Sequence, residues 1–120
     1  MDSMGCWFHW PSVHFFRSGI GFGGSCFPKD IRALISFAKS KGIEPRILEA
    51  VIGTNDDQPQ KLIALLKKHL DIRGKKIGIL GLSFKPDTDD IRESRAIPVI
   101  LTLLQGGAKI IAYDPTAMPA

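Results

Sequence analysis

The most constraining feature of the sequence is the order of apolar runs in its last third. Residues 77–82 form a short, almost wholly apolar run, and residues 109–113 form a second one. Between them, a polar loop precedes an apolar stretch, 97–105, which has the length of a short helix and stops at two glycines. A strand, a helix and a second strand in this order predict a right-handed βαβ unit of a parallel sheet, with strands buried on both faces.

The predicted fold class is therefore α/β, a helical segment followed by a partial Rossmann-like βαβ unit of a parallel sheet. Two strands alone cannot close a sheet that needs cover on both faces. We therefore expect the chain to be a piece of a larger α/β protein.

The middle of the sequence predicts helices. Pro28 fits the first turn of a helix, and apolar residues follow at helical spacing until Gly42. A second helical stretch begins at Pro45 and its apolar stripe, interrupted by a polar stretch, continues to Leu70. One long helix and two helices with a break near Pro59 both fit this pattern.

Composition excludes several classes of protein. With 44% hydrophobic and 23% charged residues, the chain is typical of soluble globular proteins and not of disordered ones. The net charge of +4 is spread over separate segments, so we expect no nucleic-acid partner. No apolar run approaches the roughly 20 residues that cross a bilayer, so we expect no membrane partner. Two cysteines without a disulfide pattern favour the cytoplasm, and the three histidines lack metal-ligand spacing, so we expect no metal.

Cys26 is the strongest candidate for chemistry. It follows a glycine-rich loop, 19–25, and stands just before the helix that Pro28 begins. A helix N-terminus and a nearby cation, here Lys29, favour the thiolate, and the loop amides can line an anion or oxyanion site. Asp30, one helical turn along, is placed to orient a water. A small buried thiol in a tight turn is the alternative, and the spacing alone favours neither.

A second candidate site follows the first predicted strand. The run from Gly78 to Phe84 is not Gly-x-Gly-x-x-Gly, so it is weak evidence for a dinucleotide. Lys85 and Arg92 lie beyond the carboxyl end of the strand, where open α/β sheets bind their ligands. These cations suit a nucleotide, and the alternative is a solvated loop in which they pair with its acidic residues.

Two longer motifs resemble one enzyme family. The motif Gly-Phe-Gly-Gly-Ser-Cys-Phe-Pro-Lys-Asp covers residues 21–30, and Phe-Lys-Pro-Asp-Thr-Asp-Asp-Ile-Arg-Glu-Ser covers residues 84–94. In this order and spacing, and together with Tyr-Asp-Pro at 113–115, they resemble the UDP-glucose/GDP-mannose dehydrogenase family. The form of the cysteine motif is most similar to the members that act on UDP-glucose. The resemblance runs from about residue 15 to residue 118.

The resemblance implies an enzyme that oxidises UDP-glucose to UDP-glucuronate with two NAD. By the motif, Cys26 forms a thiohemiacetal and then a thioester, and Asp30 assists the water and proton transfers. Lys29 and Arg92 would contact NAD. The substrate contacts that the resemblance implies are Phe15, Phe16, Arg17, Ser18, Gly19, Gly23, Phe84 and Lys85.

The resemblance also implies how the chain is divided. Residues 15–72 would be the cysteine loop and helices of the central, dimerising domain, residues 73–120 the start of the nucleotide-sugar domain, and residues 1–14 an unmatched aromatic leader. It implies a homodimer or larger oligomer and a place in polysaccharide biosynthesis. The family's N-terminal NAD-binding domain is not matched, so we expect the chain to be inactive alone. The alternative is a non-catalytic module for nucleotide-sugar binding or dimerisation.

Overall fold

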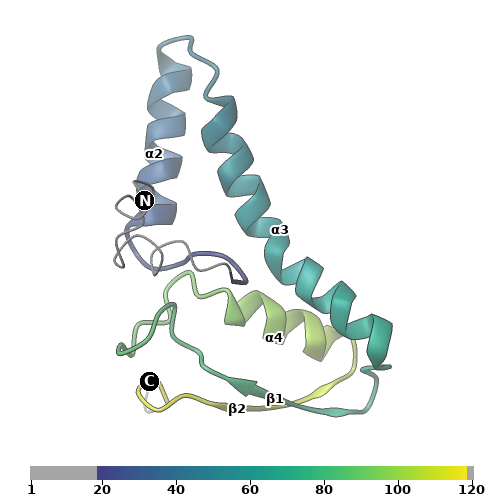
Figure 1. Cartoon of the computed structure of the whole chain (residues 1–120). Coiled ribbons are helices and arrows are strands. Elements are labelled where there is room, and N and C mark those ends of the chain that lie inside the picture. Colours follow the sequence, from purple (N-terminus) through teal and green to yellow (C-terminus); the bar gives the residue numbers. More distant parts are fainter. Residues whose placement is uncertain (1–18, 119–120) are drawn as a thin grey trace, which may run out of the picture.

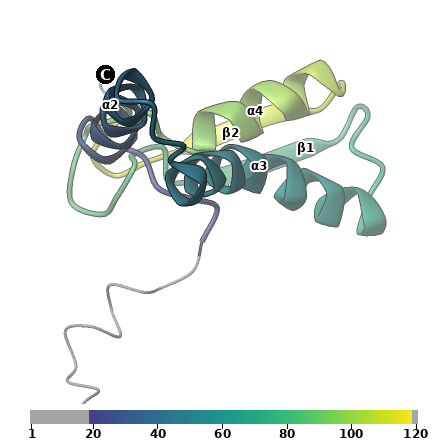
Figure 2. The same ribbon diagram turned by 90° about the horizontal axis from the view of Figure 1, so that it is seen from above.

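The computed structural model describes residues 19–118. In chain order its elements are helix α2 (Phe27–Ser40), helix α3 (Arg46–His69), strand β1 (Lys76–Leu80), helix α4 (Ala96–Gln105) and strand β2 (Lys109–Tyr113). Helices α2 and α3 form a hairpin whose second helix runs down to α4, and the two strands lie below α4 (Figure 1). Seen from above, α3 and α4 lie side by side (Figure 2).

Strands β1 and β2 pair in parallel through the α4 crossover, with a register that runs from Lys76 opposite Lys109 to Leu80 opposite Tyr113. The α/β prediction and its strand, helix, strand order are confirmed. Strand β1 ends two residues earlier than the apolar run predicts. The reason is Gly81, whose φ of +96° turns the backbone out of the strand.

The core lies between α3, α4 and one face of the sheet. Ile63 of α3 and Val99 and Leu103 of α4 are its buried centre, and Leu103 is only 1% exposed. Burial alternates along both strands, and Leu80 is 87% exposed. The expectation of strands buried on both faces is therefore wrong for the described part of the chain, because α3 and α4 cover the same face.

The helices begin where the sequence predicts. Cys26 is the N-cap of α2, and Pro28 stands in its first turn. Helix α3 is one continuous helix that contains Pro59, so the alternative of a break near this proline is wrong. Pro59 is less than 2% exposed, and its packing offsets the backbone hydrogen bond that proline cannot donate. None of the helices in residues 19–118 is long and apolar enough to span a membrane.

Candidate functional site

Cys26 stands at the point where the glycine loop becomes helix α2. Its thiol is exposed in the described part of the chain, and its Sγ lies 3.8 Å from the Ser25 Oγ. The amide of Asp30 donates to the Cys26 carbonyl at 2.8 Å, which closes the first helical turn. The position at a helix N-terminus is confirmed, and the alternative of a buried thiol is wrong within this structure.

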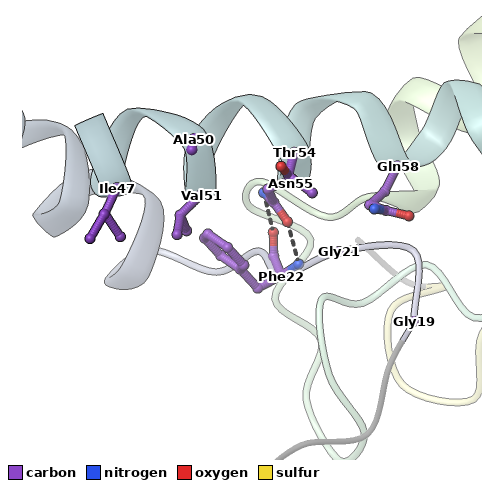
Figure 3. Close-up of a pocket in the computed structure, with 9 residues that line it drawn as sticks. All are labelled: Gly19, Gly21, Phe22, Ile47, Ala50, Val51, Thr54, Asn55 and Gln58. Carbon is purple, nitrogen blue, oxygen red and sulfur yellow. Dashed lines mark hydrogen bonds between the residues drawn. The ribbon is translucent and has the colours of Figure 1, made fainter. Parts of the chain in front are cut away.

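The glycine loop is held from one side by Asn55 of α3. Its Oδ1 accepts the Phe22 amide at 2.7 Å, and its Nδ2 donates to the Phe22 carbonyl at 3.1 Å. Figure 3 shows both bonds, and the Asn55 side chain is 4% exposed. Sequence reasoning did not assign this residue a role. The available signal was the polar interruption at 53–57 of an otherwise apolar helical stripe.

One pocket beside this loop does not include the thiol. It has a volume of about 600 Å³ and lies between the loop and α3 (Figure 3). Ile47 and Val51 give it an apolar end, Asn55 and Gln58 a polar one, and Cys26 is not among its lining residues. The candidate site is therefore defined by the contacts around the thiol and not by this pocket.

The other side of the glycine loop lies against the segment 84–95 that follows β1. The Gly24 amide donates to the Arg92 carbonyl at 2.9 Å. A Cβ at Gly24 would lie 2.7 Å from the Phe84 ring, and one at Gly23 would lie 2.9 Å from the Glu93 carbonyl carbon. The structure thus brings together two predicted substrate residues, Gly23 and Phe84, that are far apart in the sequence.

The predicted cations lie around this contact and are exposed. Asp90 accepts from the Nε of Arg92 at 3.0 Å and from its Nη2 at 2.8 Å. These bonds to the Arg92 side chain, with a further one from its backbone amide, lower the pKa of Asp90 to about 2 and raise the pKa of Arg92. Lys29 pairs with Asp30 at 3.4 Å, and the Lys85 ammonium lies 5.3 Å from the centre of the Phe84 ring.

Asp114 shapes the loop that carries Phe84. Its Oδ2 accepts the Leu82 amide at 2.7 Å and the Ser83 amide at 3.0 Å, while its Oδ1 accepts the Ala117 amide at 2.8 Å. These backbone bonds hold the pKa of the Asp114 carboxyl far below its usual range. One carboxylate therefore joins the ends of both strands beside a pocket of about 420 Å³ that includes Phe84.

Four predicted substrate residues, Phe15, Phe16, Arg17 and Ser18, lie outside the described residues. Gly19 lines the pocket of Figure 3 and is not among the residues that meet Phe84. Among residues 19–118 there is no group of three or more His, Cys, Asp or Glu side chains placed to hold a metal ion.

Two sequence models of one protein family match the chain. The model of the UDP-glucose/GDP-mannose dehydrogenase family, central domain, matches residues 6–57. The model of the UDP binding domain of the same family matches residues 78–120. The first match contains Cys26 and Asn55, and the second contains Phe84 and Arg92, so the contact described above joins the two matched regions.

Curated relatives agree with these matches. The chain is 52% identical over 103 residues to UDP-glucose 6-dehydrogenase AglM of Haloferax volcanii, covering 86% of this chain and 24% of the relative. It is 48% identical over 106 residues to UDP-glucose 6-dehydrogenase TuaD of Bacillus subtilis, covering 88% of this chain and 23% of the relative. The chain thus spans about a quarter of the length of the curated relatives it matches.

Solved structures give the same result for the fold. A UDP-glucose dehydrogenase from Pyrobaculum islandicum superposes with a TM-score of 0.84 at 48% identity, over 88% of this chain and 25% of that one. A GDP-mannose dehydrogenase from Pseudomonas aeruginosa superposes with a TM-score of 0.77 at 39% identity, over 87% of this chain and 23% of that one.

Proposed function

The chain belongs to the UDP-glucose/GDP-mannose dehydrogenase family, and on that premise we propose that it carries the thiol and the nucleotide-sugar loop of a UDP-glucose 6-dehydrogenase. The observation that carries this proposal is the contact between Gly24 and Arg92, at 2.9 Å. It places the loop of Cys26 against the loop of Phe84 and Lys85. A reacting sugar and its nucleotide need both loops at once.

We propose that the substrate is a nucleotide sugar held beyond the carboxyl ends of the strands. Ligands of open parallel sheets bind at that edge. Phe84 offers a ring there, and the exposed ammonium of Lys85 suits a diphosphate. The relatives favour UDP-glucose as this nucleotide sugar, since those at 52% and 48% identity are named UDP-glucose 6-dehydrogenases.

The exposed cations beside Cys26 also fit the pyrophosphate of NAD. Lys29 and Arg92 would hold it, with side chains 72% and 70% exposed. NAD, when bound, supplies the hydride acceptor for each of two oxidations. In the chain itself, the Cys26 thiolate would form a carbon–sulfur bond with the aldehyde carbon of the half-oxidised sugar. After the second oxidation, Asp30 would take the proton of the water that breaks this bond and releases the carboxylate.

The second candidate function is a binding or dimerisation module, and one observation favours it. Exposed apolar side chains on α2 and α3 include Phe37 at 60% and Ile47 at 80% exposure. Exposed apolar surface of this kind favours association, so we propose that a second copy of this chain covers it. Light scattering of the purified chain tests this, and a monomer at micromolar concentration would contradict it.

Calorimetry of the 120-residue chain with UDP-glucose tests the nucleotide-sugar proposal. We expect binding that Cys26→Ser leaves unchanged and Lys85→Ala weakens by about tenfold, since a cation on a diphosphate contributes ~1.4 kcal/mol or more. UDP alone should retain most of the affinity. Equal binding by Lys85→Ala and the parent chain would show that this loop does not hold the nucleotide.

The same chain, given NAD and UDP-glucose, tests whether these 120 residues suffice for the oxidation. We expect no accumulation of NADH from these 120 residues, because they cover about a quarter of the dehydrogenases they match. NADH formation that Cys26→Ser abolishes would show that the chain is active alone and would overturn this expectation.

A further inference from the structure

Arg95 is a nearly buried cation at the junction of the two matched regions. It is 9% exposed, and its Nη1 donates to Oδ1 of Asp56 in α3 at 3.0 Å. Its Nη2 donates to Oε2 of Glu93 at 3.1 Å. One guanidinium therefore joins a helix of the first region to the segment that precedes α4.

The aliphatic part of Arg95 lies against the glycine loop. A Cβ at Gly21 would be 3.2 Å from both Cγ and Cδ of Arg95, and 2.5 Å from the Asn55 Oδ1. Gly21 also has a φ of +111°, which side chains rarely adopt. At Gly21 the loop therefore lies close to both Arg95 and Asn55, which leave no room for a side chain.

Glu93, one of the two acidic partners of Arg95, has a strained backbone conformation. Its φ of +53° lies in the left-handed region, where a residue with a side chain is held only by its surroundings. Its carbonyl group faces Gly23 and accepts the Arg95 Nε at 3.4 Å. Arg32 of α2 also reaches the Glu93 carboxylate, at 3.6 Å. Two cations therefore contact Glu93, whose carbonyl group meets the glycine loop.

We propose that Arg95 is a positioning residue, which holds Gly21 and Glu93 so that the loop of Cys26 keeps a fixed place against the segment 84–95. The side-chain hydrogen bonds of Arg95 go to Asp56 and Glu93, and not to Cys26, Phe84 or Lys85. The inference deepens the proposed function and rests on it for its significance, because this contact unites the thiol with the nucleotide-sugar loop.

Amide hydrogen exchange of the 120-residue chain, measured by NMR, tests the proposal directly. In Arg95→Met we expect the Gly24 amide, bonded to the Arg92 carbonyl, to exchange about tenfold faster, while the Ile63 amide in the core stays unchanged. Arg95→Lys should give an intermediate rate, because lysine keeps the charge but lacks the planar fork that reaches two carboxylates.

The matched control is Glu49→Gln. It removes the ion pair with Lys39, at 2.6 Å, which also joins α2 to α3 but stands at the opposite end of α2 from Cys26. We expect no change at Gly24. Unchanged exchange at Gly24 in Arg95→Met, or an equal rise at Gly24 and Ile63, would overturn the proposal. Should Arg95→Met fail to fold, Arg95→Lys and Glu93→Gln carry the same test. No nucleotide is present, so failure here leaves the calorimetric test of the proposed function independent.

Discussion

Replacing Gly23 by alanine should destabilise the protein because there is no room for the added methyl group. The added Cβ would lie 2.9 Å from the Glu93 carbonyl carbon and closer still to its oxygen. These are backbone atoms, which cannot rotate away as a flexible side chain does. Overpacking of this kind costs about 1–3 kcal/mol, and we expect about 2 kcal/mol or more here. For a chain of this size that lowers the melting temperature by roughly 10 °C.

Gly53→Ala is the matched control for this substitution. Gly53 lies inside α3, and a Cβ built there meets nothing within 4 Å. Alanine is about 1 kcal/mol better than glycine in a helix interior, so this variant should melt roughly 4 °C higher than the parent. The same chemical change thus has opposite signs at two positions of one chain.

Thermal unfolding followed by far-ultraviolet circular dichroism measures both variants. A Gly23→Ala chain that melts within about 2 °C of the parent would refute the close approach of the loop to Glu93. Loss of stability in Gly53→Ala would refute instead the assignment of open space around α3. The exchange rate of the Gly24 amide should also rise in Gly23→Ala and not in Gly53→Ala, because the clash displaces the loop from Glu93.

Three further variants test other parts of the structure. Asn55→Ala removes both hydrogen bonds to Phe22 and should lower the free energy of unfolding in urea by about 1–3 kcal/mol. A loss below about 0.5 kcal/mol would contradict the role of Asn55 in holding the glycine loop. Asp90, whose pKa is lowered to about 2, should contribute stability above pH 4 that is lost as the pH falls toward 2. Asp90→Asn should lack this contribution and its loss in acid. A titration of the Asp90 carboxyl near pH 4 by NMR would disprove the pairing with Arg92. Leu103→Ala, at a side chain 1% exposed, should cost about 2–5 kcal/mol by the same urea assay, and a smaller loss would show that the core collapses around it.

The parts of the fold that depend on local pattern could be predicted from the sequence. The βαβ order follows from two apolar runs around a helix-length stretch, and the start of α2 follows from Pro28. Cys26 at that start is a local feature too, so its place at the N-cap was predictable. The continuity of α3 through Pro59 was not, because it depends on the packing of a buried proline ring.

The contacts that assemble the candidate site could not be predicted in the same way. Asn55 and Arg95 act through partners that lie far along the sequence, and neither belongs to a motif that names its partner. In the sequence, Arg95 looks like an ordinary surface cation, but in the structure it is only 9% exposed. In the sequence, Asp114 stands out only as part of Tyr-Asp-Pro, whereas its bonds to Leu82 and Ser83 follow from the strand register. The tertiary structure alone decides which polar groups meet.

The hydrogen bond from Gly24 to Arg92 has a consequence for the order of folding. Closing so long a stretch of chain costs entropy that only the completed contact repays. During synthesis α2 and α3 are made before the segment 84–95, so at first the glycine loop has nothing to bind on that side. The surroundings of the Cys26 thiol are therefore completed late, and the nascent chain carries this thiol without its final neighbours until α4 has docked.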